Sequence, residues 1–288
     1  MVGDRPLSSE RGSEMKHVLN ATLAVALTMV VAFAPSAAGA EPGSGGVGGT
    51  GGTWSPIFEL AASPRVDGPP PAGATVSFVL DDGQPDGSVG IAEGSAAKQF
   101  LFFNQFSLLG VGNAQLEEIQ VLFQSEPSVV VGAAIELVVW HDPDGDPSNG
   151  AVRLAQYDET IQAVDGATFS AYPLPEPLAL PLGGELLIGV VPRFIVSGIT
   201  PANTPAVIDT TTVLGRSWLA VWTGDPPAPV TLPPDQFLGL VDDVLPGTWL
   251  IRGFASPRAT VEIPTLRGWG VLLLASLLAW LGWRRLGG

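Results

Sequence analysis

The stretch LEEIQVLF at residues 116–123 decides the fold class. It contains β-branched and aromatic residues, and part of it alternates between apolar and polar positions, as a half-buried β-strand does. Similar runs lie between turn-forming residues at 75–80, 99–106, 135–140, 185–191, 217–222 and 248–254. Several such strands in one region predict an all-β domain built as a single β-sandwich.

Composition and charge narrow the functional classes. Gly and Pro together make up 63 of the 288 residues, which favours frequent turns over long helices. Residues 41–257 contain 24 Asp and Glu against 6 Lys and Arg, and this net charge of −18 repels phosphate backbones, so we expect no nucleic acid partner. The chain has no cysteine, which excludes disulfides, thiolate catalysis and Cys-based metal sites.

The first 40 residues have the pattern of a Sec-type signal peptide. Lys16 leads into an apolar run at 21–34, and Ala38 and Ala40 supply the small residues at the −3 and −1 positions of a cleavage site. Fourteen apolar residues are too few to cross a hydrocarbon core of about 30 Å. We therefore expect export and cleavage after Ala40.

The remaining chain divides by composition. Residues 1–14 are polar and of mixed charge, so translation is expected to start at Met15, although an extended leader is the alternative. Residues 41–53 (EPGSGGVGGTGGT) cannot bury apolar surface and are expected to be a linker. The β-sandwich is assigned to residues 54–258, and residues 259–288 form a separate C-terminal segment.

The C-terminal segment ends in a short apolar run with arginines on both sides. Residues 268–283 carry no charge, Arg267 precedes them, and Arg284 and Arg285 follow. A helix of this length reaches about 24 Å, so a transmembrane helix here requires local thinning of the bilayer and interfacial tryptophans. The terminal arginines favour a cytoplasmic C-terminus, which places the acidic domain across the membrane.

This segment also carries a short motif followed by a Trp-Gly pair: Ile263, Pro264, Thr265, Leu266, Trp269 and Gly270. Together with the apolar run and the basic end, the motif resembles the IPTL-CTERM sorting domain, a relative of the PEP-CTERM signals. The resemblance implies recognition by a membrane exosortase, which cuts near the motif and passes the protein from the inner membrane to the cell surface or its extracellular polymer. Pro264 disfavours helix before it, so the motif is expected to be extended. A plain C-terminal anchor is the alternative.

A second resemblance concerns the central domain. The turn at 80–83 (LDDG), the Ser-Val-Gly at 88–90 and the runs at 136–140 and 186–190 are similar to a jelly-roll-type β-sandwich found in bacterial exported proteins. The resemblance implies a single jelly-roll-like β-sandwich over residues 75–254. Such domains share no single activity, so it transfers no function.

The densest polar cluster is HDPDGDPSNG at residues 141–150. Asp142, Asp144 and Asp146 alternate, and their carboxylates would suit Ca²⁺, which takes six to eight oxygen ligands. An EF-hand is excluded because the twelfth position from Asp142 is Arg153 rather than Glu. The same residue types build hairpin loops, and a loop with no cofactor is the favoured interpretation.

Other candidate chemistry is sparse. Asp81, Asp82 and Asp86 form a second acidic turn, where paired carboxylates would suggest glycoside hydrolysis, but turn formation explains them equally well. The histidines are His17 and His141, and no Gly-x-Ser-x-Gly elbow accompanies them. We therefore expect no enzymatic activity.

Four tryptophans could stack on sugars, although a buried core position is the commoner one: Trp140, Trp218, Trp222 and Trp249. The leading prediction is a non-catalytic surface or matrix protein processed by an exosortase. The alternative is a carbohydrate-binding or hydrolytic module that acts on extracellular polysaccharide.

Overall fold

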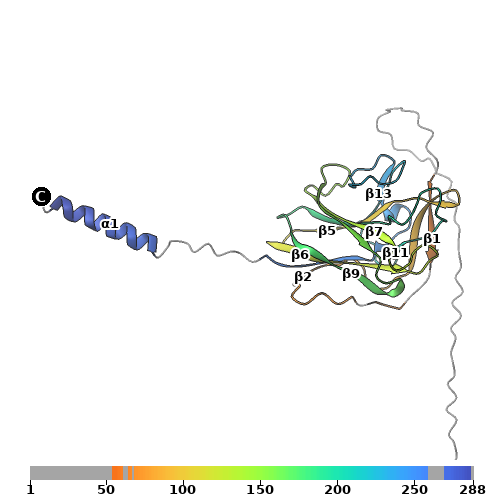
Figure 1. Cartoon of the computed structure of the whole chain (residues 1–288), viewed down its shortest axis with the longest axis horizontal. Helices are drawn as coiled ribbons and strands as arrows, with labels where there is room; N and C mark the ends of the chain where they lie inside the picture. Colours follow the sequence, from red (N-terminus) through yellow and green to blue (C-terminus); the bar gives the residue numbers. More distant parts are fainter. Residues whose placement is uncertain (1–53, 61–63, 67, 259–268, 287–288) are drawn as a thin grey trace, which may run out of the picture.

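The computed structural model describes residues 54–60, 64–66, 68–258 and 269–286 (Figure 1). Strands dominate this part of the chain, and the predicted all-β sandwich is confirmed. The strands are β1 (Trp54–Leu60), β2 (Val76–Phe78), β3 (Gly87–Glu93), β4 (Ala96–Ala97), β5 (Leu101–Ser107), β6 (Ala114–Gln124), β7 (Ala134–Asp142), β8 (Val152–Thr160), β9 (Asp165–Ala179), β10 (Glu185–Val191), β11 (Ala206–Asp209), β12 (Ser217–Val221), β13 (Phe237–Leu240), β14 (Thr248–Trp249) and β15 (Ile251–Pro257). A 3₁₀ turn, η1 (Val241–Asp243), and a helix, α1 (Trp269–Leu286), complete the order.

The strands form two packed layers. One layer is the six-stranded sheet β13-β12-β5-β10-β7-β8. The other contains the sheets β2-β15-β6-β9 and β1-β3-β11-β14, which meet where the Leu250 amide donates to the Val207 carbonyl at 3.2 Å and the Leu250 carbonyl accepts from Leu122 at 3.1 Å. Figure 1 shows β5 and β7 in one layer and β6 and β9 in the other.

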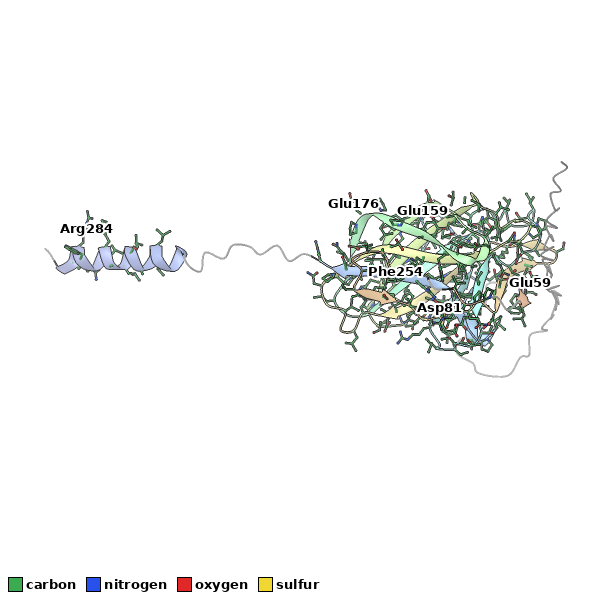
Figure 2. The ribbon with its side chains drawn as sticks, turned by 90° about the horizontal axis from the view of Figure 1, so that it is seen from below. Glu59, Asp81, Glu159, Glu176, Phe254 and Arg284 are labelled. Carbon is green, nitrogen blue, oxygen red and sulfur yellow. The ribbon has the colours of Figure 1, made fainter. Side chains whose placement is uncertain are left out.

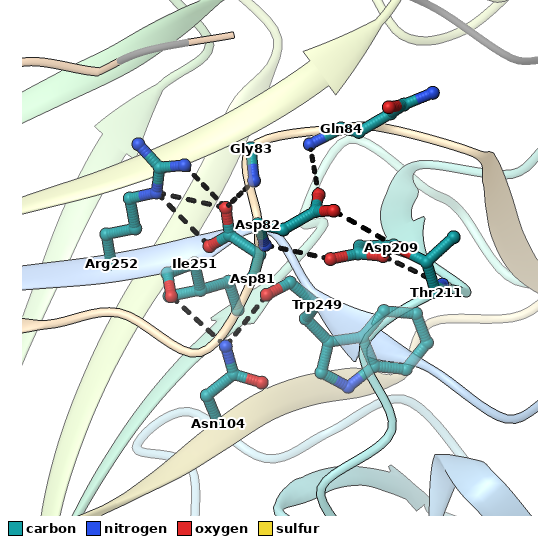
Figure 3. A network of polar contacts seen from close by, with 10 residues as sticks. All are labelled: Asp81, Asp82, Gly83, Gln84, Asn104, Asp209, Thr211, Trp249, Ile251 and Arg252. Carbon is teal, nitrogen blue, oxygen red and sulfur yellow. Dashed lines mark hydrogen bonds and ion pairs between the residues drawn. The ribbon is translucent and has the colours of Figure 1, made fainter. Parts of the chain in front are cut away.

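The main core lies between these layers. Phe102 of β5 contacts Trp249 of β14 with ring centroids 5.6 Å apart. Buried Asn104 crosses the same space, because its Nδ2 donates to the carbonyls of Trp249 at 2.8 Å and Ile251 at 3.1 Å (Figure 3). The apolar core thus contains a polar bridge whose donor is paired, and the bridge helps to fix how the layers align.

The six-stranded sheet is apolar on both faces. Phe102 and Phe106 of β5 face the main core, while Leu101 and Phe103 face a second cluster with Trp140 and other buried side chains. Residues 223–236 connect β12 to β13, and Val230 of this connection is buried in the second cluster. The run at 100–103 (FLFF) is continuously apolar for this reason, since a strand covered on both faces does not alternate.

The stretch at 116–123 forms the middle of β6, as predicted. Its partial alternation has a structural cause. The register with β9 shifts between Leu116 and Glu118 and again between Leu122 and Gln124, and the first shift changes which side chains face the main core. Leu116 enters the main core, whereas Leu122 packs in a third cluster with Phe169.

The C-terminal apolar run folds as helix α1, but the structure does not support the prediction that this helix spans a membrane. Within the described residues, no helix is both long enough and apolar enough to cross a membrane. Arg284 and Arg285 occupy the last turn of α1, so its charge-free part ends at Trp283 and is about 22 Å long.

Candidate functional site

Asp81 and Arg252 form an ion pair inside the sandwich (Figure 3). Arg252 Nη2 lies 2.5 Å from Asp81 Oδ1, and Nε lies 3.1 Å from Oδ2. The Gly83 amide donates to Asp81 Oδ1 at 3.0 Å, and the guanidinium lies 4.2 Å from the centre of the Phe169 ring. Every partner of Asp81 is therefore a structural one, and the pair fastens the turn after β2 to β15.

Asp82 and Asp86 hold the loop that follows β11. The Gln84 amide donates to Asp82 Oδ1 at 2.8 Å, and the Thr210 amide donates to Asp86 Oδ2 at 2.9 Å. Asp209 accepts from the Asp82 amide at 2.9 Å. Burial raises the pKa of the Asp209 carboxyl, but this bond and those from Thr211 and its neighbour outweigh burial and hold the pKa below its usual value. The acidic turn is thus built from Asx turns and caps.

The acidic loop at 141–150 follows the same principle. Asp142 Oδ1 accepts from the Gly145 amide at 3.2 Å, Asp144 Oδ1 from the Asp146 amide at 3.1 Å, and Asp146 Oδ1 from the Ser148 amide at 2.9 Å. In the described part of the chain, no group of three or more His, Cys, Asp or Glu side chains is placed to hold a metal ion. The carboxylates that suggested Ca²⁺ cap successive turns instead.

The tryptophans do not form the stacking face that a sugar-binding module would need. Trp140, Trp222 and Trp249 are buried, as the commoner interpretation predicts. Trp218 is half-buried, stacks on Phe103 with centroids 6.2 Å apart, and donates from Nε1 to a glutamine side chain at 2.8 Å. The exposed face of the Trp218 ring is by itself too small to form a sugar-stacking surface.

A polar cluster that the sequence did not indicate surrounds Glu126. Its Oε2 accepts from the Thr204 amide at 2.8 Å, and its Oε1 accepts from the hydroxyls of Ser88 and Thr204. Burial raises the pKa of the Glu126 carboxyl, and the nearby Glu59 carboxylate adds to this. The cluster joins residues on or beside β3, β6 and β11, whose separation in the chain leaves no local pattern to detect.

A second unpredicted cluster holds residues 223–236 over the sheet. Arg193 pairs with buried Glu136, with Nε 2.8 Å from Oε2. The same guanidinium donates to the carbonyls of Pro226 at 2.6 Å and Pro227 at 2.9 Å, while Arg153 donates to the Val230 carbonyl at 2.8 Å. These cations keep the second apolar cluster covered.

The sandwich also has an open hollow of about 300 Å³ between β2 and β5. Its lining includes Phe78 and Phe106, whose rings lie 5.7 Å apart, and Arg216. Arg216 already pairs with Glu185 at 2.9 Å. The hollow therefore offers a ligand a small apolar surface and one cation, Arg216, which is already paired with Glu185.

The predicted sorting residues fall mostly outside the described residues. This applies to Ala38 and Ala40 of the cleavage site and to the motif: Ile263, Pro264, Thr265 and Leu266. Trp269 and Gly270 begin α1, and Arg284 and Arg285 end it, with the Arg284 guanidinium 4.5 Å from the centre of the Trp280 ring. Figure 2 shows Arg284 at the end of α1 remote from the sandwich.

Helix α1 exposes its apolar side chains over most of its circumference. They are between 47% and 82% exposed: Leu273, Leu274, Leu277, Leu278, Trp280, Leu281 and Trp283. An apolar helix that its own domain does not cover requires another apolar environment.

Comparison with known proteins does not place the chain in a family. No protein-family model matches it, and no curated protein matches it. The crystal structure of the cysteine protease and lectin-like domains of Cwp84, a surface layer associated protein of Clostridium difficile, is 13% identical with a TM-score of 0.41, covering 64% of this chain and 36% of that chain. A structure of clostridial Cwp84 after propeptide cleavage is 14% identical with a TM-score of 0.37, covering 56% and 37%. The chain spans little more than a third of either, and likeness at this level carries no conclusion.

Proposed function

We propose that this chain is an exported surface or extracellular-matrix protein whose C-terminal segment is an IPTL-CTERM-type sorting signal processed by a membrane exosortase. The observation that carries the proposal is the uncovered helix α1. Seven large apolar side chains are exposed on it. At about 1.5–3 kcal/mol for each side chain, leaving them in water costs on the order of 10–20 kcal/mol, which a lipid environment removes.

The length and charge of α1 suit a temporary hold at the inner membrane. Its charge-free part is shorter than a hydrocarbon core of about 30 Å, so its binding to the bilayer is weaker than that of a permanent membrane anchor. Arg284 and Arg285 complete the basic end of the sorting pattern. A precursor held in this way presents residues 263–266 to an enzyme within the membrane.

The sandwich itself is proposed to be a non-catalytic, structural or interaction domain of jelly-roll type. The chain crosses from the six-stranded sheet to the opposite layer and back twice, once from β5 through β6 to β7 and once from β8 through β9 to β10. Such crossings between two sheets are a feature of jelly-roll domains. Two of its buried carboxylates support this role, because Asp81 and Glu136 are paired with arginines. No geometry favours the polysaccharide-binding alternative, since three of the four candidate tryptophans are buried.

A pulse-chase experiment in a bacterium that carries an exosortase tests the proposal. The wild-type chain should appear first in the membrane fraction and then as a shorter form at the surface. Replacing residues 263–266 by alanine should leave the full-length form in the membrane. Pro257→Ala is the matched control, because it alters an exposed proline at the end of β15 just before the segment, and it should be processed normally. Normal processing of the four-alanine variant would refute the proposal.

A further inference from the structure

Two loops at one end of the sandwich carry exposed leucines and no charge. Residues 108–113 (LLGVGN) join β5 to β6, and residues 180–184 (LPLGG) join β9 to β10. Leu109 is 87% exposed and Leu182 is 79% exposed, the highest values among the leucines of the sandwich. Uncharged loops with exposed leucines are unexpected here, because residues 41–257 carry a net charge of −18.

These loops adjoin each other. The Leu108 amide donates to the Gly184 carbonyl at 3.0 Å, and the Leu180 amide donates to the Ala114 carbonyl at 2.9 Å. Gly183 and Gly184 have φ angles of 81° and 74°, a conformation that other residues rarely adopt, so the chain turns sharply just after Leu182. The backbone thus holds the two leucines at one tip.

The C-terminal segment leaves the sandwich at this same tip. The Arg258 amide donates to the Asn113 carbonyl at 2.9 Å, and Pro257 lies opposite Ala114 in the sheet. The ten residues between Arg258 and Trp269 can span at most about 40 Å. A membrane that holds α1 therefore lies within reach of the two loops.

We propose that loops 108–113 and 180–184 rest on the membrane, with Leu109 and Leu182 inserted among zwitterionic lipid headgroups while α1 holds the precursor. This inference rests on the membrane hold proposed above for α1. The loops themselves carry no charge. At the same end, exposed Arg258 is outnumbered by Asp144 and Asp146, which lie exposed on the loop between β7 and β8 and disfavour anionic lipid. Uncharged leucines require only an apolar interface, and each strengthens partitioning about ten-fold. Such a contact would keep the cleavage segment beside the bilayer.

The absence of cysteine from the sequence allows a direct test with spin labels. Single-cysteine variants Leu109→Cys, Leu182→Cys, Ile199→Cys and Leu277→Cys of the full chain are labelled and reconstituted in phosphatidylcholine vesicles. Ile199 is the matched control because it is 80% exposed and lies beyond the other end of β10. Collision rates with oxygen, which concentrates in lipid, and with a water-soluble nickel chelate are measured at each label.

Labels at 109 and 182 should collide with oxygen several-fold more, and with nickel several-fold less, than the label at 199. Equal values at 109, 182 and 199, with a lipid signature at 277, would overturn this inference and leave the membrane hold of α1 standing. A water signature at 277 would overturn both. A Leu109→Ser/Leu182→Ser variant should also bind these vesicles about a hundred-fold more weakly than wild type, while Ile199→Ser should not. If the double change weakened binding to native membranes alone, the partner would be a protein and the lipid assignment would be wrong.

Discussion

Arg252 and Asp81 are 171 positions apart in the chain, yet the guanidinium of one binds both carboxylate oxygens of the other inside the sandwich. Their side chains are 7% and 0% exposed. The pair joins the turn after β2 to β15, the strand that leads into the C-terminal segment.

Asp81→Asn should lower the free energy of unfolding by about 3–5 kcal/mol, because it leaves the Arg252 charge buried without its counterion. Urea denaturation measures the change. Arg216→Gln is the control, since its pair with Glu185 is partly exposed and should contribute at most about 1 kcal/mol. Equal losses in the two variants would show that the Asp81 pair is not buried as described.

Trp249→Ala should cost about 3–5 kcal/mol, because the indole is fully buried against Phe102 and its removal leaves a cavity. Trp218→Ala should cost less, since that side chain is only half-buried. Thermal unfolding of both variants gives the comparison. A larger loss at Trp218 would contradict the assignment of Trp249 to the core.

Glu126→Gln should change the pH dependence of stability. The folded pKa of Glu126 is raised above 4.5 by burial, so the folded state binds the proton more tightly than the unfolded state. Wild-type stability should therefore rise relative to the variant as pH falls from 7 toward 4.5, and the difference should level off below that value. Parallel stability profiles for the two proteins over this range would contradict the burial of Glu126.

Asp146→Ala should lower Tm by the same amount in EGTA and in millimolar Ca²⁺, because the Asp146 carboxylate caps its own turn through Ser148 and Asn149. Wild-type Tm should likewise be unchanged by either addition. Differential scanning calorimetry measures both. A rise in wild-type Tm with Ca²⁺ that the variant lacks would restore the calcium hypothesis.

The sequence indicated seven strand regions, including the edge strand β2, but it missed the buried strands β3 and β11 as well as several edge strands. The runs at 99–106, 116–123 and 185–191 correspond to β5, β6 and β10, all covered on at least one face. Strands β8 and β9 were not predicted. Both are edge strands with exposed polar positions, and β9 contains three prolines, which an edge tolerates because fewer of its amides need partners.

The contacts of the candidate site residues were harder to predict than the strands, because they join residues that are far apart in the chain. Local composition predicted that Asp142 and Asp81 lie in turns. Asp81 does, whereas Asp142 is the last residue of β7 and caps the turn that follows. It could not show that Arg252 pairs with Asp81 or that Thr204 donates to Glu126, because these contacts depend on the packing of two layers. The buried state of Trp140 likewise depends on residues 223–236 folding back over the sheet.

The most direct test of the proposed sorting is the intact mass of the protein recovered from surface material of a bacterium that carries an exosortase. The account predicts a chain that begins at Glu41 and ends near residues 263–266, without α1. Recovery of the chain with its C-terminus intact through Gly288 would contradict processing and would favour a permanent anchor.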